Sequence, residues 1–237
     1  MLVVLAVVGA LVLRPGGPFA DPAPSSSVAR PTPDSPTRPA PSAAPQSPSL
    51  SPSTSPSPTE PCPVGSPFSR QEHPRDGRVH GGGLSFPRQP GWEEPGPQAS
   101  AFTWAYDLGE TDLQVEPQWY AAYAIGAVAM VDGFEDPQTA AELALRCSTE
   151  SSLYRNVTSR TDLVNEETTL DGYRAWTIRT EIRAEDERTT AAGDTIQITV
   201  VDLDSPESLS FFWGSAPIGD TTFTAQLDEV VDQLRVG

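Results

Sequence analysis

The chain has 237 residues and a formal net charge of −17 at pH 7, and all 15 of its basic residues are arginine. Most of the charge belongs to residues 79–237, in which nine arginines stand against 27 acidic residues. A surface this acidic repels nucleic acid and anionic lipid headgroups, so we expect no nucleic-acid partner. The acidity either keeps the domain soluble or directs an acidic face toward a cationic partner.

The chain opens with the wholly apolar run LVVLAVVGALVL at residues 2–13. This run is too short to cross a bilayer, which takes about 20 residues, but its length suits the central region of a signal peptide. No basic residue precedes it, so we expect residues 1–20 to be a signal peptide or a membrane anchor truncated at its start. The rest of the chain is then extracytoplasmic, either secreted or anchored to the cell membrane. No cysteine follows the run closely, so this route predicts no lipid anchor.

A proline-rich segment comes next. Residues 21–67 hold 15 prolines and 16 serines or threonines, with too few apolar residues to bury a core. The polar stretch 68–78 continues it, and we predict that residues 21–78 form a disordered, extended linker. Binding to proline-recognising modules and O-glycosylation remain alternative uses of this segment. The folded domain is expected at residues 79–237.

Three strands are predicted in the first half of this domain. GLSF at residues 83–86 is a short strand that ends at a proline, and AFTWAYD at 101–107 alternates with aromatic residues on one side. The long apolar run QWYAAYAIGAVAMV at 118–131 contains many aromatic and β-branched residues. We interpret this run as a buried strand, with a helix as the alternative.

A helix is predicted to follow, with Asp136 as its N-cap, Pro137 at its first position and an end near Glu150. Cys147 shares the apolar face of this helix and should point inward. The only other cysteine is Cys62, and an even number of cysteines in an exported chain favours a disulfide. A Cys62–Cys147 bridge would fasten the end of the linker to the helix, whereas two free thiols are the alternative.

The second half of the domain is predicted to be mainly β-structure. Asp171 and Gly172 join two alternating strands, which is a strong hairpin signal. Strands follow at TIQITVVDL (195–203) and LSFFWG (209–214), and a final helix covers residues 222–236. The predicted fold is therefore α+β, an antiparallel sheet flanked by helices.

Motifs typical of enzymes are incomplete in this chain. HGGG at residues 80–83 matches an oxyanion-hole string of some lipases, but the chain has no G-x-S-x-G motif. Its only histidines, His73 and His80, precede every candidate serine of the domain. The cysteines and histidines do not have the spacing of a zinc site, and the sequence has no glycine-rich phosphate loop. We therefore predict no catalytic residue, metal site or cofactor. The acidic run 185–187 is interpreted as a solvated loop tip.

Aromatic residues are the remaining candidates for function. Side chains alternate along a strand, so Phe211 and Trp213 share one side while Phe212 takes the other. Phe212 either packs under a helix on the second face or is exposed for binding. The same reasoning applies to Trp119 and Tyr120. We therefore name Trp119, Tyr120 and Phe212 as candidates for an exposed binding patch.

These segments together resemble a known kind of domain. LSFPRQPGW at residues 84–92 resembles the opening of Mog1/PsbP-like domains, and LDGYRAWTIRTEI, GDTIQITVVDL and LSFFWGSAP follow in the same order. With the export segment and the proline-rich stalk, the chain resembles actinobacterial LpqN-type lipoproteins and proline-rich secreted antigens, although it lacks their lipid-attachment cysteine. The resemblance implies an α/β/α sandwich and a noncatalytic, extracytoplasmic module that binds proteins.

The expected function is accordingly that of a binding or adaptor protein of the bacterial cell envelope. Its partner would be an unidentified envelope protein, and only its N-terminal segment would touch the membrane. One alternative is a carrier of a small ligand or lipid, which requires an apolar cavity between sheet and helix. The other is an envelope hydrolase, which requires two acids of raised pKa in one cleft.

Overall fold

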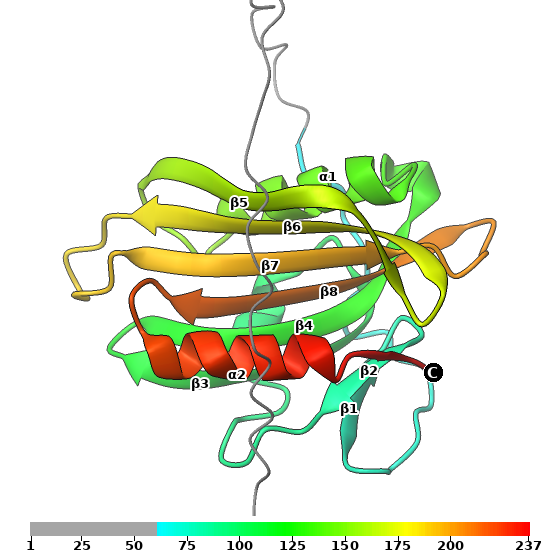
Figure 1. Cartoon of the computed structure of the whole chain (residues 1–237), viewed down its shortest axis with the longest axis horizontal. Coiled ribbons are helices and arrows are strands. Elements are labelled where there is room, and N and C mark those ends of the chain that lie inside the picture. Colours follow the sequence, from blue (N-terminus) through cyan, green and yellow to red (C-terminus); the bar gives the residue numbers. More distant parts are fainter. Residues whose placement is uncertain (1–60) are drawn as a thin grey trace, which may run out of the picture. The chain divides into compact units, whose positions relative to one another are not determined.

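The computed structural model describes residues 61–237, so the expected signal segment and most of the expected linker lie outside the described residues. Its main element is a six-stranded sheet, in which every neighbouring pair of strands is antiparallel. The strand order is β3-β4-β8-β7-β6-β5 (Figure 1). The strands are β3 (Tyr106–Glu116), β4 (Trp119–Ala129), β5 (Val157–Leu170), β6 (Tyr173–Ala184), β7 (Gly193–Val201) and β8 (Ser208–Pro217).

Helices cover the two faces of this sheet, which confirms the α+β prediction. In Figure 1 α2 (Thr221–Asp232) crosses in front of the sheet and α1 (Pro137–Thr149) lies behind it. A second sheet joins β2 (Leu84–Pro87) to β1 (Arg78–Gly81) on one side and to β9 (Arg235–Val236) on the other. Two short 3₁₀ helices complete the domain, η1 (Pro97–Ala101) and η2 (Met130–Asp132).

The two faces bury separate apolar clusters. Ala140 and Ala144 of α1 pack with Phe211 and Trp213, whereas Leu227 of α2 belongs to the cluster on the opposite face. The central strands are therefore covered on both sides, as the unbroken burial of β7 shows. In β7, Ile196, Ile198 and Val200 belong to the cluster that includes α1, and the polar residues between them are buried as well.

The predicted start and end of α1 and the start of α2 are confirmed, and the cause is local. The end predicted for the last helix is wrong, because α2 ends at Asp232 and residues 235–236 form β9. The Asp136 side chain accepts hydrogen bonds from the main-chain N–H groups of Gln138 and Thr139, which satisfies two donors that a helix start leaves without partners. Asp220 acts in the same way at the start of α2. The hairpin at Asp171 and Gly172 also forms, with positive φ angles of 49° and 89°.

The strand expected at residues 101–107 is wrong. Helix η1 ends at Ala101, an irregular segment with a turn follows, and β3 begins only at Tyr106. The main-chain N–H groups of Phe102 and Ala105 bond to carbonyl groups three residues earlier, as in turns. Phe102 and Trp104 are nevertheless both buried. The alternating aromatic residues therefore mark the buried side of an irregular segment. The sequence period alone does not distinguish such a segment from a strand.

Residues 61–78, which the composition assigned to the linker, lie against the domain. The main-chain N–H groups of Gly65 and Ser66 bond to the carbonyl groups of Thr103 and Ala105, over 2.7 and 2.9 Å. The domain therefore includes residues that precede Val79. The bonds of Gly65 and Ser66 are made by the main chain, and main-chain contacts leave no mark in composition.

The expected disulfide is present between Cys62 and Cys147, with Cα atoms 5.6 Å apart. Cys147 is buried on α1, as its helical position predicted. The bridge joins the first described residues to the layer behind the sheet, and disulfides of this kind are typical of proteins outside the cytoplasm. Among residues 61–237, no helix is both long and apolar enough to span a membrane.

Breaking this disulfide should lower the free energy of unfolding. The two cysteines are 85 residues apart, and closing a loop of that size stabilises the folded chain by about 4.5 kcal/mol in the chain-entropy model. Urea unfolding followed by tryptophan fluorescence, with and without reductant, measures the difference. The Cys62→Ser variant should unfold at the midpoint of the reduced chain and should not respond to reductant. Equal midpoints for the oxidised and reduced chain would contradict this role.

Candidate functional site

A cavity of about 200 Å³ opens at one end of the main sheet, where β4 and β7 begin and β8 ends. We call it the Asp194 pocket. The loops after α1 and after β6 form its sides, and η1 contributes one residue. The pocket is lined by Gln98, Gln118, Trp119, Tyr120, Ala122, Ser152, Leu153, Tyr154, Arg155, Asp186, Arg188, Asp194, Trp213 and Ser215.

Asp194 is a buried carboxyl group with both oxygens engaged. The Trp119 indole N–H donates to its Oδ1 over 2.9 Å, and the Tyr154 hydroxyl donates to its Oδ2 over 2.7 Å. Burial raises the pKa of Asp194 to about 7, although the two hydrogen bonds favour the ionised form. Because neither oxygen is free, Asp194 acts here by fixing the positions of Trp119 and Tyr154.

The loop after β6 folds back over the pocket. Its Arg188 donates to both carboxylate oxygens of Asp186 and, through Nη1, to Gln118 Oε1 over 3.1 Å. These bonds from Arg188 hold the pKa of Asp186 down to about 2. The Asp186 side chain is only 8% exposed, so the solvated loop tip expected at this position is wrong for that residue. The guanidinium of Arg188 draws the carboxylate inward, which a run of acids in sequence does not reveal.

Glu116 secures the same loop from the other side. Its carboxylate accepts hydrogen bonds from the Thr189 hydroxyl over 2.7 Å and from the Thr190 main-chain N–H over 2.9 Å. The bond from Thr189 is the largest cause that lowers the pKa of Glu116. The loop is thereby fastened to the end of β3, so one wall of the pocket has a defined position.

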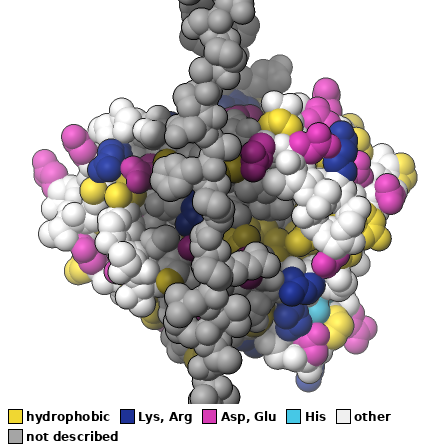
Figure 2. Space-filling model, viewed as in Figure 1, with side chains coloured by type: hydrophobic (Ala, Val, Ile, Leu, Met, Phe, Trp, Pro, Cys, Tyr) yellow, Lys and Arg dark blue, Asp and Glu magenta, His cyan; other side chains and the backbone are white. Residues whose placement is uncertain are grey.

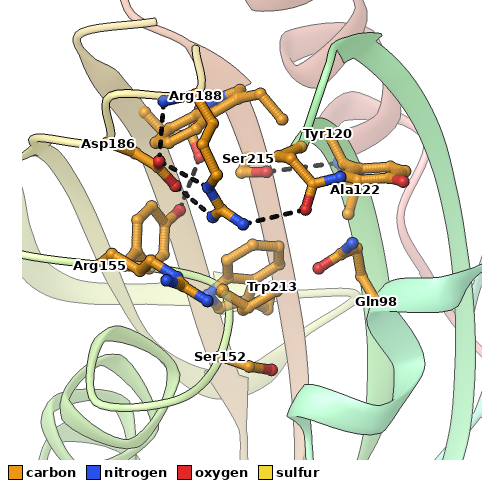
Figure 3. A pocket seen from close by; sticks show the side chains of 14 residues that line it. Gln98, Tyr120, Ala122, Ser152, Arg155, Asp186, Arg188, Trp213 and Ser215 are labelled. Carbon is orange, nitrogen blue, oxygen red and sulfur yellow. Dashed lines mark hydrogen bonds and ion pairs between the residues drawn. The ribbon is translucent and has the colours of Figure 1, made fainter.

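Four polar side chains in the pocket are available to a ligand. Tyr120, Gln98, Ser152 and Arg155 make no side-chain hydrogen bond within the described part of the chain, and three of them surround Trp213 in Figure 3. Arg155 acts on Asp186 through its charge alone. The pocket thus offers a guanidinium, a carboxamide and two hydroxyl groups beside an indole ring.

The structure separates the three aromatic candidates. Trp119 is 4% exposed and forms the pocket wall, and Tyr120 is partly exposed beside it. Phe212 is fully buried on the opposite face of the sheet, where its ring lies near those of Phe86 and Tyr123. An exposed patch made of all three is therefore wrong. Phe212 follows the other alternative and packs in the cluster beneath α2.

The most informative missed residue is Asp194, and its sequence position carried a signal. It has the same parity along the strand as the apolar residues Ile196, Ile198 and Val200, which are all buried. An acid on the apolar side of a strand is unusual, because burying a charge requires a partner. That pattern pointed to a hydrogen-bonded carboxyl group. The roles of Tyr154 and Arg155 had no such signal, because both lie in an irregular loop.

Glu110 and Asp112 form a second pair of buried acids, on β3. Glu110 Oε2 accepts from the Gly96 N–H over 2.8 Å, and Asp112 Oδ2 accepts from the Gln98 N–H over 2.9 Å. Burial raises the pKa of Glu110 to about 9, and the charge of Asp112 adds to this shift. Burial also raises the pKa of Asp112. Both acids hold the main chain that carries Gln98 to the pocket.

The HGGG string has a structural role in the described residues. Gly82 and Gly83 turn the chain between β1 and β2 with φ angles of 57° and 82°, which glycine adopts at little cost. The Gly82 carbonyl accepts a hydrogen bond from the Ser210 hydroxyl. Across residues 61–237, no three His, Cys, Asp or Glu side chains come together as a group that could hold a metal ion.

No protein-family model and no curated protein matches the chain. Among solved structures, the Ran-binding protein Mog1p of Saccharomyces cerevisiae has 15% sequence identity and a TM-score of 0.41, over 65% of this chain and 90% of that chain. A mutant of protein Mog1 has 17% identity and a TM-score of 0.40, over 67% and 94%. PsbP (CyanoP) of Synechocystis sp. PCC 6803 has 12% identity and a TM-score of 0.36, over 73% and 100%. This likeness concerns the fold, and no partner or activity is carried over.

Replacing Glu110 by glutamine should change how stability depends on pH. The pKa of Glu110 is about 9 in the folded chain, against 4.5 for an unperturbed glutamate. The folded chain therefore keeps a proton that the unfolded chain releases, so this group's stabilisation is complete below about pH 4.5 and is lost as the pH rises through about 9. Glu110→Gln cannot ionise, and its carbonyl can still accept from Gly96. Relative to the natural chain, the variant should become more stable as the pH rises.

Urea midpoints measured across this pH window test that expectation. Glu187→Gln, at an exposed loop position, is the matched control and should follow the natural chain. A constant difference between Glu110→Gln and the natural chain at every pH would contradict the assignment.

Replacing Tyr154 by phenylalanine should raise the pKa of Asp194 further. The Tyr154 hydroxyl is a donor that favours the ionised carboxylate, and losing one such bond corresponds to roughly one pKa unit. Carboxyl ¹³C NMR of the aspartates, recorded against pH, measures the shift directly. Tyr173→Phe, a change outside the residues that line the pocket, is the control. A pKa that stays in place or falls in Tyr154→Phe would show that the bond does not act on Asp194.

Proposed function

We propose that this chain is a noncatalytic binding or adaptor protein of the bacterial cell envelope, related to the LpqN-type lipoproteins. It is extracytoplasmic, and it is secreted or held at the membrane by its N-terminal segment. The Cys62–Cys147 disulfide supports an oxidising location. The proline-rich segment suits a spacer between a membrane and the folded domain.

The observation that carries this proposal is the set of uncommitted polar groups in the Asp194 pocket. Small-molecule sites usually enclose about 300–1,000 Å³, whereas this cavity measures about 200 Å³. That volume suits one side chain of a protein partner. Arg155, Gln98 and Ser152 all have hydrogen-bond donors to offer, so the entering side chain is one that accepts hydrogen bonds, such as a carboxylate, a carboxamide or a hydroxyl.

The other groups of the pocket support binding over catalysis. Asp194 has both oxygens engaged, and Asp186 is ion-paired with Arg188. The Ser215 hydroxyl accepts from the Ala122 main-chain N–H. A nucleophile requires a base within hydrogen-bond reach, and each of these groups is instead occupied in holding the walls of the pocket. Such fixed walls present the free groups in a constant arrangement.

A lipid carrier is the second candidate function. The groove between α1 and the β5–β6 hairpin would then hold the lipid. It measures about 530 Å³ and includes Leu143, Leu145 and Ile182 in its lining. However, Arg160 lies in the same groove and pairs with Glu142 over 2.8 Å. An acyl chain would have to bury against these charges, which is costly. The polar pocket is therefore the better supported site.

Site-specific photocrosslinking tests the proposal. The full chain carries a photoreactive amino acid in place of Ser152, at the pocket rim, and is exposed to envelope fractions of the source organism. We expect one predominant crosslinked protein, whose identity and contact residue are read by mass spectrometry. Arg155 is exposed in the free chain. Adding Arg155→Glu should reduce this crosslink by about tenfold or more, as expected when a charge that the complex would bury against its partner is reversed.

The control is charge reversal at Arg174, which lines a different surface pocket and is 57% exposed. Arg174→Glu should leave the crosslink unchanged. Equal loss in both charge reversals would mean that general electrostatic attraction, and not the pocket, recruits the protein. Co-purifying lipid in place of a crosslinked protein would favour the carrier, and turnover of an envelope substrate that depends on Asp194 would favour a hydrolase.

A further inference from the structure

A second pocket gathers positive charge on this acidic protein. It measures about 300 Å³ and lies beside β1, away from the Asp194 pocket; we call it the arginine cleft. In Figure 2 arginine side chains cluster beside a histidine at the lower right, in the region where Figure 1 shows β1 and β2. The cleft is lined by Arg70, Gln71, His73, Pro74, Arg75, Arg78, His80, Arg88 and Glu94.

Three of the four arginines in the cleft have no carboxylate partner among the described residues. The Arg70 guanidinium donates to the His80 carbonyl over 2.7 Å. The Arg78 guanidinium donates to the hydroxyl and carbonyl of Ser85 and to the carbonyl of Gln233. Arg75 makes no hydrogen bond or ion pair within residues 61–237, and it is exposed. Arg88 differs, because it pairs with Glu94 over 2.9 Å. Most of the guanidinium charge is thus uncompensated.

Two acids near the cleft, Asp107 and Asp76, are hydrogen-bonded to its two histidines. His73 Nε2 lies 2.7 Å from Asp107 Oδ1, and His80 Nε2 lies 2.9 Å from Asp76 Oδ1. The two imidazole rings stack with their centroids 5.8 Å apart. Asp107 also accepts from the main-chain N–H of Gln71. These contacts fix the segment that carries Arg70 and Arg75 against β1.

We propose that the arginine cleft binds a phosphoryl group. A guanidinium presents a planar fork of donors that matches the oxygens of phosphate or carboxylate. A carboxylate has two oxygens and one charge, so a single fork satisfies it. Three guanidiniums that line one cleft suit a tetrahedral group that offers more oxygens and up to two charges. The volume accommodates a phosphoryl group and a few attached atoms, as in a phosphate monoester or a lipid headgroup.

The arrangement is prepared before any ligand arrives. Arg78 is already held by three hydrogen bonds, yet a guanidinium has five N–H donors, so two remain for a ligand. Its side chain is half-buried, which fixes its position. A preorganised donor loses less side-chain entropy on binding. Arg70 and Arg75, which are more exposed, would close on the ligand from the solvent side.

Isothermal titration calorimetry of the full chain with inorganic phosphate, at constant ionic strength, tests the proposal. We expect saturable binding that Arg75→Gln weakens by about tenfold, equivalent to ~1.4 kcal/mol. Arg75 has no described partner, so its replacement should not disturb folding, which urea unfolding verifies. Arg174→Gln, outside the cleft, is the matched control and should bind phosphate as the natural chain does.

A second arm separates the two sources of a phosphoryl group. Vesicles of phosphatidylcholine containing phosphatidic acid, compared with phosphatidylcholine alone, report on a lipid headgroup through co-sedimentation. Binding in either arm that Arg75→Gln weakens and Arg174→Gln preserves supports the proposal. Absence of binding in both arms, or equal loss in the two variants, overturns it. Because the cleft and the Asp194 pocket share no lining residue, this outcome is independent of the proposed protein-binding function.

Discussion

The covering of the central strands on both faces is the constraint on which the rest of this structure depends. β8 pairs with β4 on one side and β7 on the other, so that Trp213 lies opposite Ala124 and Ile198. The large apolar side chains of such a strand each enter one of two apolar clusters, and Phe212, between Phe211 and Trp213, has no exposed side to occupy. Interaction with a partner is therefore left to strand ends and loops. The Asp194 pocket lies at the end of the sheet where β4 begins. Asp107, which bonds to His73 of the arginine cleft, lies near the other end, because its neighbour Tyr106 pairs with Ala127 close to the end of β4. The two candidate sites thus lie toward opposite ends of the same strand.

Much of the fold could be predicted because its signals are local. The cap at Asp136, the turn at Asp171 and the alternation of β6 each depend on residues close in sequence, and all are confirmed. The misses come from contacts between distant segments. Phe102 and Trp104 alternate because one side of an irregular segment is buried, and residues 61–78 join the domain through main-chain bonds that composition does not record. The candidate site could be predicted only in part. The parity of Asp194 was visible along β7, whereas Tyr154 comes from a loop whose path depends on the whole sheet.

The buried acids explain how a strongly acidic chain keeps its loops in place. Asp194, Asp107, Glu110 and Asp112 are each nearly or fully buried, and each accepts hydrogen bonds from main-chain or side-chain donors of an irregular segment. A carboxylate is a strong acceptor with several lone-pair sites, so one acid can organise a loop that has no regular structure. Part of the acidic excess thus serves the interior. The same choice has a cost in alkaline conditions, because burial disfavours the ionised form of Glu110 and Asp194.

The uneven placement of charge also reconciles an acidic protein with an anion site. At physiological ionic strength, charges separated by more than about 8 Å are largely screened from each other in solvent. A phosphoryl group at the arginine cleft therefore responds mainly to the charges that line the cleft, which are Arg70, Arg75 and Arg78 together with the Arg88–Glu94 ion pair, and little to acids elsewhere on the domain. Farther out, the net charge of −17 still opposes the approach of large polyanions. The combination favours a small anion, or a single headgroup, over nucleic acid. The contacts proposed within residues 61–237 are all to the phosphoryl oxygens of the ligand.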